Sequence, residues 1–163
     1  MLAIQAGSDA IASVLTFMFY YLLRDAESYR RLQAELDKAF PDPDAVLNVK
    51  LLNGLPFLTA ICEESLRLGT PLGGQPRIVP KGGYVFDGVF VPEGTIVGVP
   101  GWTSQTSPEN FWPYPDEFRP QRWMPGGLGP GSRLVKQAIL AFSYGASLVG
   151  SLVSSEPLLI SVS

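Results

Sequence analysis

The sequence predicts a mainly α-helical fold with a small antiparallel β-meander, which is an α+β class. Apolar residues recur at helical spacing through the first 68 residues, whereas most of the 17 glycines and 15 prolines lie between residues 71 and 131. Within that turn-rich middle, Asp87-Gly88 separates two short runs of β-branched and aromatic residues, which is a strong hairpin signal. The 163 residues suffice for about one domain with a sizeable core.

The first helix is predicted over residues 2–24 and is apolar nearly all round, which favours burial on all sides. Residues 10–23 carry no charge, but a bilayer-spanning helix needs about 20 such residues. A signal peptide would require positive charge before this run, but no Lys or Arg precedes it. We therefore interpret it as a buried core helix rather than a membrane segment.

Two further helices are predicted by their end signals. Asp25 can cap a second helix that Pro41 ends, and a third starts at Pro56 and runs to Leu68, with Gly69 as its stop. The second helix is amphipathic, with apolar residues at helical spacing: Tyr29, Leu32, Leu36 and Phe40.

Glu64 lies in the apolar stripe of the third helix, together with Phe57, Ile61 and Leu68. A carboxylate there is costly unless it is paired and hydrogen-bonded. Arg67, three residues later, can reach it. On spacing alone, a buried pair and an ordinary, partly exposed ion pair are equally good interpretations.

The middle of the chain predicts a β-meander. Strands at 84–86 and 89–91 flank the Asp87-Gly88 turn, and a second turn at 92–94 leads into a strand that begins at 95–97. Two hairpins alone are marginally stable, so we expect this sheet to pack on the helices.

Beyond the meander, Ser107-Pro108-Glu109 predicts the cap and first turn of a short helix. The segment 112–123 alternates prolines with aromatic residues and cannot form a regular helix or central strand. We expect it to be held by side-chain packing and arginine hydrogen bonds, followed by a glycine–proline loop at 125–132.

Composition excludes several functions. The chain has no histidine and one cysteine, which removes histidine-based hydrolase triads, imidazole zinc sites and disulfide frameworks. The net charge of −3 without a basic stripe gives no footprint for nucleic acid. The glycines at 126–131 lack the spacing and the preceding strand of a dinucleotide site, and 145–150 lacks a nucleophile elbow.

Four segments carry recognisable motifs, in this order: Ala6–Ala10, Glu64–Arg67, Phe118–Trp123 and Phe142–Gly145. Together, at their spacing, they resemble the carboxy-terminal part of a cytochrome P-450 of a fungal microsomal type. The resemblance covers residues 1 to about 145 and implies a partial P-450 fold, from the I helix to the start of the haem-binding loop.

The resemblance implies roles for the first segment and for Arg77. Gly7 would open the I helix where dioxygen sits, and Asp9 would be the acidic residue of proton delivery. Ala10 stands where the family commonly has threonine, so the hydroxyl used in oxygen activation is missing. Arg77 resembles the arginine that pairs with a haem propionate; the alternative is a solvent-exposed arginine at a strand end.

The resemblance also implies that Glu64, Arg67 and Arg122 form a buried ion triad, because one carboxylate can bridge two arginines. In the haem loop, Phe142 and Gly145 match the family pattern as cofactor-binding residues. The three fixed positions after Gly145 hold Ser147, Val149 and Ser151, in place of arginine, the axial cysteine and glycine. The only cysteine, Cys62, lies on the third helix, where we expect a small buried hydrophobe.

Residues 1–145 are therefore expected to be a partial P-450 domain, and residues 146–163 a non-homologous, poorly packed or disordered tail. A retained intron or a frameshift near residue 146 would explain such a tail. The resemblance implies a haem-dependent monooxygenase acting on a small hydrophobic organic substrate, with electrons from an NADPH-cytochrome reductase. It also implies location on the cytosolic face of the endoplasmic reticulum membrane, although no anchor is expected in this chain. On this interpretation the chain descends from an enzyme but is inactive alone, because it lacks the axial cysteine. The alternative is a non-catalytic fragment or pseudoenzyme from a truncated or mis-spliced gene.

Overall fold

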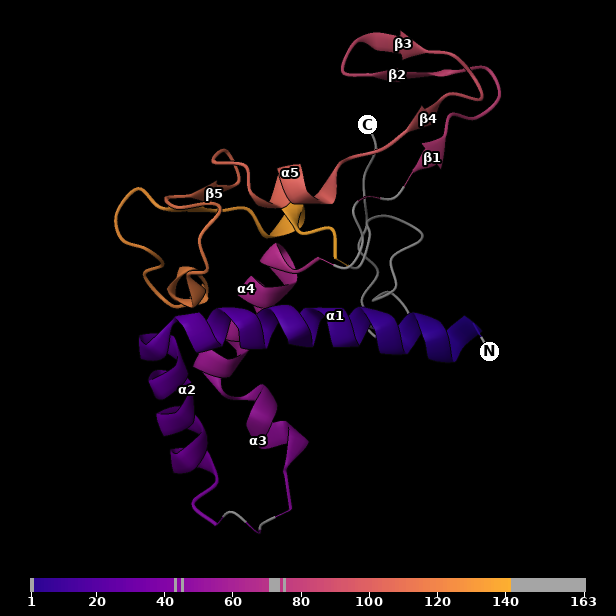
Figure 1. Ribbon diagram of the computed structural model, residues 1–163. Coiled ribbons are helices and arrows are strands. Elements are labelled where there is room, and N and C mark those ends of the chain that lie inside the picture. Colours follow the sequence, from indigo (N-terminus) through magenta and orange to yellow (C-terminus); the bar gives the residue numbers. More distant parts are fainter. Residues whose placement is uncertain (1, 43, 45, 71–73, 75, 142–163) are drawn as a thin grey trace.

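The fold places one long helix between a helical layer and a set of short strands (Figure 1). The computed structural model describes residues 2–42, 44, 46–70, 74 and 76–141. Helices α2 and α3 lie on one side of α1, α5 and the strands lie on the other side, and α4 passes between them (Figure 1). The mainly α-helical class with small antiparallel sheets is confirmed.

Helix α1 (Leu2–Arg24) has the predicted bounds, but it is not buried on all sides. Leu22 is buried, in a core cluster with Phe57 and Ile61 of α4. Ile11 and Leu23, in contrast, are 63% and 74% exposed. The elements that pack on α1 lie near its carboxy-terminal end, so its amino-terminal half extends beyond them (Figure 1). No helix in the described part of the chain is both long and apolar enough to cross a bilayer.

Helices α2 (Ala26–Ala39) and α3 (Val49–Asn53) are each capped by the residue that precedes them. The Asp25 carboxylate accepts hydrogen bonds from the first-turn N–H groups of α2, as predicted. Helix α3 was not predicted. Asn48 caps it in the same way, and its five residues are too few to show a helical period.

Helix α4 (Pro56–Leu68) has the predicted start, end and stop residue. Leu55, at its N-cap position, offers no side-chain acceptor. Instead the Glu35 carboxylate of α2 accepts from the backbone N–H groups of Phe57 and Leu58, at 3.0 and 2.8 Å. Two of the donors left free at the start of a helix are thus satisfied by another helix.

The hairpin of β2 (Tyr84–Phe86) and β3 (Val89–Val91) forms as predicted, around Asp87 and Gly88, which both have positive φ. The rest of the meander differs. Strand β4 (Ile96–Val97) pairs not with β3 but with β1 (Arg77–Ile78), so the hairpin is an excursion between two paired strands.

The hairpin also does not pack on the helices, contrary to the expectation. Almost all residues of β2 and β3 are exposed, and the hairpin lies away from the helical body (Figure 1). The pairing of β1 with β4 brackets the hairpin at its base and takes the place of a continuous three-stranded sheet.

The short helix predicted at 107–109 is a turn, and the helix lies just before it as α5 (Gly101–Gln105). The aromatic–proline segment is irregular, as predicted. Strand β5 (Phe111–Trp112) pairs with β6 (Arg133–Leu134), a cis peptide bond follows at Trp112-Pro113, and 3-10 helices η1 (Pro120–Trp123) and η2 (Lys136–Ala138) complete the described chain.

Candidate functional site

Glu64 is the centre of a buried polar cluster, and it is fully shielded from solvent. Its Oε1 accepts hydrogen bonds from Arg67 Nη2 at 2.8 Å, from the backbone N–H of Arg119 at 2.9 Å and from Arg122 Nε at 3.4 Å. Its Oε2 accepts from Arg67 Nε and from Trp123 Nε1, at 2.8 and 2.9 Å. Five donors therefore replace the water that this carboxylate loses on burial.

Arg67, one turn further along α4, is also fully buried. Two of its guanidinium nitrogens form the bidentate pair with Glu64. Its Nη1 donates to the backbone carbonyls of Gln105, at 2.7 Å, and Pro115, and its Nη2 donates to that of Glu117 at 2.9 Å. A single side chain thus joins α4 to α5 and to the aromatic–proline segment.

Arg122 approaches Glu64 from η1 and is 3% exposed. Besides its contact with Glu64, it donates to the carbonyls of Pro113 and Tyr114, at 3.1 and 2.7 Å. Burial lowers the pKa of the Arg122 guanidinium, and the Glu64 carboxylate opposes that shift. An arginine remains charged even so, and two cations therefore share one buried carboxylate.

The local sequence explains why carbonyls point into this cluster. Prolines in the segment 113–120 remove N–H donors and prevent a regular ladder, which leaves carbonyls free for side-chain donors. The ring of Tyr21 on α1 stacks on Phe118 with 5.0 Å between centroids and fixes this segment from the other side.

The cluster is closed rather than open for chemistry. Each oxygen of Glu64 and each guanidinium nitrogen of Arg67 already has a protein partner. No face of the pair is open to a substrate, because both side chains have no solvent-accessible surface. The arrangement can therefore hold segments together, and it offers no group to a reacting molecule.

The structure brings Glu64, Arg67 and Arg122 together and adds donors that the sequence reasoning missed. Trp123 adds its indole N–H, and Arg119 adds a backbone N–H while its side chain pairs with Glu117 at the surface. Trp123 adjoins Arg122 in the same motif, so an indole needing a partner was a usable signal.

The oxygen-activation residues expected on α1 lie apart from this cluster. Gly7, Asp9 and Ala10 fall within α1, and Asp9 is exposed. The Asp9 carboxylate accepts from Ser8 Oγ at 3.3 Å, while Ser13 Oγ donates to the Asp9 carbonyl at 2.8 Å. Ser13 therefore uses its hydroxyl within the helix.

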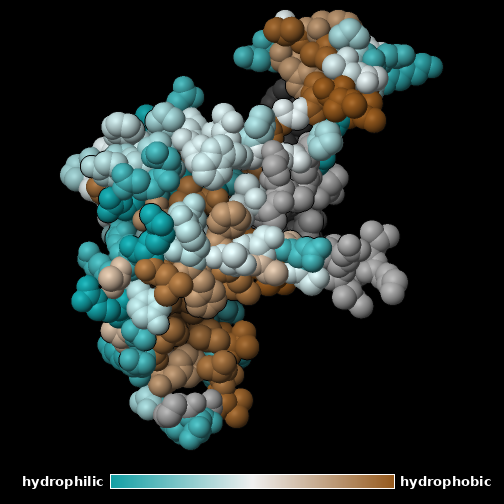
Figure 2. Space-filling model, in the orientation of Figure 1, coloured by the Kyte–Doolittle hydropathy of each residue, from teal (hydrophilic) through white to brown (hydrophobic). Residues whose placement is uncertain are grey.

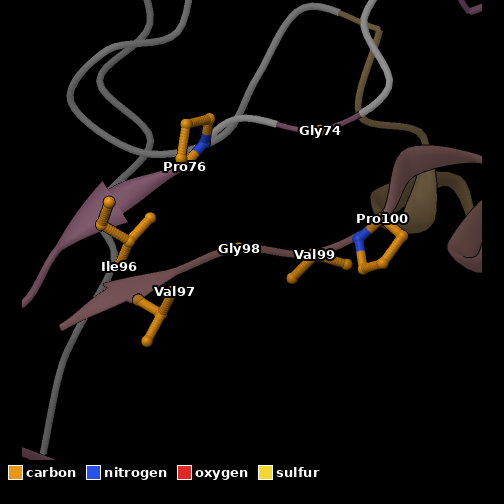
Figure 3. Close-up of a pocket in the computed structure, with 7 residues that line it drawn as sticks. All are labelled: Gly74, Pro76, Ile96, Val97, Gly98, Val99 and Pro100. Atoms are coloured by element: carbon orange, nitrogen blue, oxygen red, sulfur yellow. The ribbon is translucent and has the colours of Figure 1, made fainter.

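Arg77 lies in β1 and is exposed; its Nη1 donates to the Pro76 carbonyl at 3.2 Å. Next to β1 is an open pocket of about 360 Å³, which lies between the chain at Gly74 and Pro76 and the stretch that runs from β4 towards α5 (Figure 3). Its lining side chains are apolar, but polar backbone groups also face it, and the lining comes from Gly74, Pro76, Ile96, Val97, Gly98, Val99 and Pro100.

Cys62 is exposed on α4, which corrects the expectation of a buried hydrophobe. It falls outside the apolar stripe that contains Ile61 and Glu64. Partial desolvation and the charge of Glu63 raise the pKa of the Cys62 thiol. Phe142, Gly145, Ser147, Val149 and Ser151 lie outside the described residues. No group of three or more metal-ligating side chains occurs among the residues the structure describes.

Comparison with known proteins gives one consistent family. Residues 1–147 match the family model for cytochrome P-450. The chain is 36% identical over 168 residues to the cytochrome P-450 monooxygenase dpfgJ of Gibberella zeae, covering 100% of this chain and 34% of that protein. It is 42% identical over 145 residues to BipB of Cochliobolus sativus, and 36% identical over 159 residues to pisatin demethylase of Fusarium vanettenii.

Those last two matches cover 87% and 94% of this chain, but 27% and 29% of the relatives. The chain thus spans about a third of the length of the curated relatives it matches. Two solved structures share the fold. A cyanobacterial P-450 with retinoic acid bound has a TM-score of 0.78 at 25% identity, over 93% of this chain and 34% of its own. A zebrafish P-450 with progesterone has a TM-score of 0.73 at 26% identity, over 90% and 32%.

Proposed function

The chain belongs to the cytochrome P-450 family, and we propose that it carries part of a haem-dependent monooxygenase domain without the axial ligand that the chemistry needs. Members of the family bind haem and act as monooxygenases, inserting one oxygen atom from O2 into organic substrates. The observation that carries this proposal is Val149, at the position where the haem-loop pattern has its cysteine. On this proposal the chain is a non-catalytic piece or pseudoenzyme on its own.

The described residues supply no fitting axial ligand for the haem iron. The family holds its haem iron through a cysteine thiolate. The one thiol of this chain is Cys62, on the exposed side of α4, and its raised pKa disfavours the thiolate form. The chain has no histidine to replace it. No step of oxygen chemistry is therefore assigned to these residues.

We assign residues 1–145 to the partial P-450 domain, in which Glu64, Arg67 and Arg122 tie α4 to the aromatic–proline segment. Gly7, Asp9 and Ala10 are assigned to the oxygen-activation segment, and Arg77, Phe142 and Gly145 to haem binding. Arg77 is exposed in β1, next to an open pocket, and a guanidinium suits a carboxylate, which supports its assignment to a carboxylate of a bound group.

We assign residues 146–163 to a tail that departs from the haem-loop sequence. The family match ends at residue 147, which supports this boundary, whereas the alignment with the Gibberella relative runs over the whole chain. Translation of the nucleotide sequence past codon 145 in the other two frames tests the origin of this tail. If a nearby stretch encodes Arg-x-Cys-x-Gly, the tail arose by a frameshift or a retained intron; the absence of that motif contradicts this origin.

Family members generally use reductase partners and organic substrates. For the complete protein we propose an NADPH-cytochrome reductase as electron donor and a small hydrophobic substrate. We propose the cytosolic face of the endoplasmic reticulum membrane as its location, since relatives such as BipB of Cochliobolus sativus are fungal P-450 monooxygenases.

A chimera tests the missing ligand. Residues 1–151 replace the matching stretch of the Gibberella relative, once as they stand and once with Ser147→Arg, Val149→Cys and Ser151→Gly. We expect no thiolate-type absorption shift of the reduced carbon-monoxide complex in the first chimera, and recovery of the shift in the second.

Two controls sharpen this experiment. Cys62→Ser in the restored chimera is expected to leave the spectrum unchanged, because that thiol is not the ligand. A thiolate-type shift in the chimera that retains Val149 would overturn the proposal, and so would its loss on Cys62→Ser.

A further inference from the structure

Gln105, the last residue of α5, is fully buried and uses both ends of its side-chain amide. Its Nε2 donates to the Arg67 carbonyl at 2.6 Å, and its Oε1 accepts from the Leu140 backbone N–H at 2.7 Å. One side chain therefore links two backbone segments, 38 and 35 residues away from it in sequence.

The orientation of this amide is determined by its partners. A flipped amide would place its NH2 group against the Leu140 N–H and its oxygen against the Arg67 carbonyl, two repulsive contacts. The Arg67 carbonyl belongs to the last turn of α4, where helix carbonyls lack intrahelical partners. Gln105 thus caps α4 and positions Leu140 with the same group.

Neighbouring contacts strengthen the same junction. Arg67 Nη1 donates back to the Gln105 carbonyl at 2.7 Å, so the two residues each bind the other's backbone. Ser104 Oγ donates to the Ala138 carbonyl at 3.2 Å. Two consecutive side chains of α5 therefore hold the segment 138–140, which reaches the junction just before Phe142.

We propose that Gln105 is a positioning residue, whose side-chain amide fixes the Leu140 backbone against Arg67 of the Glu64 and Arg67 pair, two residues before the segment assigned to haem binding. The assignment of residues 142–145 to haem binding rests on the proposed function. The two hydrogen bonds of the Gln105 amide, called the clamp below, do not depend on it. Gln105 acts on the Leu140 backbone, and its contacts within the described residues include none with the residues assigned to oxygen activation.

Residue-resolved hydrogen exchange of the full chain tests the clamp. The Leu140 amide is expected to be protected in the wild-type chain. In Gln105→Met, which keeps the length but removes donor and acceptor, Leu140 is expected to exchange about tenfold faster, while amides of α2 keep their rates. A general loss of stability would instead accelerate all slowly exchanging amides together.

Two further variants complete the comparison. Gln105→Glu keeps an acceptor for Leu140 but places a carboxylate oxygen against the Arg67 carbonyl, so it is expected to accelerate Leu140 exchange as Gln105→Met does. Gln33→Met makes the same change at an exposed position of α2 and is expected to alter no rate at Leu140.

Free-peptide exchange of Leu140 in the wild-type chain would overturn the proposal, without any need for a variant to fold. Equal acceleration of all amides in Gln105→Met would also overturn it. The haem-loop assignment fails separately: a restored chimera without the thiolate-type spectrum, together with a protected Leu140, rejects the loop assignment and retains the clamp.

Discussion

Glu64 shows how a charged residue can occupy an apolar helix stripe. Its carboxylate lies at the position where Phe57, Ile61 and Leu68 predict a core contact, and all four residues are buried. Five hydrogen bonds compensate its desolvation, and two arginines balance its charge. Removing the Glu64 carboxylate takes an acceptor from these donors and leaves two buried arginines without their counter-ion.

Glu64→Ala is therefore expected to destabilise the fold by about 3–5 kcal/mol, the usual cost of removing one member of a buried ion pair. Urea denaturation followed by far-UV circular dichroism measures the difference. Glu63→Ala, one residue earlier and partly exposed, is the matched control and is expected to cause little change. Similar stabilities for the two variants would contradict the role of Glu64.

The reactivity of the Cys62 thiol is set by the groups around it. It lies on the outer side of α4, so it is accessible, yet burial and Glu63 raise the pKa of its thiol. We expect alkylation by iodoacetamide to go to completion, but with a pH midpoint above that of a free cysteine. Glu63→Gln is expected to lower that midpoint.

The sign of the stability effect follows from the same shift. Because the folded-state pKa of Cys62 exceeds the unfolded value, the unfolded chain deprotonates first. The stability that the protonated Cys62 thiol contributes is therefore complete below the unfolded-state pKa, and it is lost as the pH rises from there through the folded-state pKa. A midpoint at or below that of the free amino acid, measured by the pH dependence of the alkylation rate, would contradict the raised pKa.

At the scale of elements, α4 is held at both ends by side chains from other helices. Glu35 of α2 caps its first turn, and Gln105 of α5 caps its last. Arg31 of α2 also lies over the Phe57 ring, at 4.1 Å from its centroid. The position of the Glu64 cluster therefore depends on how α2 and α5 pack.

Glu35→Ala is expected to destabilise the fold by about 1–2 kcal/mol, because it leaves two helix N–H groups of α4 without their acceptor. Asp37→Ala removes an exposed carboxylate from the same helix and is the control. Thermal denaturation of both variants checks this expectation, and equal melting temperatures would refute the cap.

At the scale of the whole molecule, large apolar side chains remain at the surface. Figure 2 shows hydrophobic patches over the hairpin and over the α2–α3 end of the molecule. On α1 an apolar stripe with a spacing of four residues is 43–74% exposed: Ile11, Leu15, Phe19 and Leu23. Exposed apolar surface of this extent favours association.

The stripe predicts that the isolated chain self-associates. Replacing Ile11, Leu15, Phe19 and Leu23 with alternating Lys and Glu is expected to shift the chain from large assemblies to monomer, without loss of helical content. Light scattering after size exclusion measures this. Leu22→Glu, at a buried position on the same helix, is the contrast and is expected to unfold the core instead. Unchanged assembly in the four-fold variant would contradict the prediction.

Features that depend on residues close together in the sequence were predictable, whereas contacts between distant segments were not. The bounds of α1 and α4, the Asp25 cap and the β2–β3 hairpin were predictable, because periodicity, prolines and an Asp-Gly turn act within a few residues. The motifs that carry Glu64, Arg67 and Arg122 were visible for the same reason.

Only the tertiary structure decided what these elements meet. It paired β4 with β1 rather than β3, left the hairpin and the stripe on α1 exposed, and placed Cys62 at the surface. It also supplied Trp123, Glu35 and Gln105 as partners from distant segments. Hydrogen bonds over tens of residues depend on packing, which one short sequence window does not encode. The replacement of the expected cysteine by Val149, in contrast, was determined by the sequence alone.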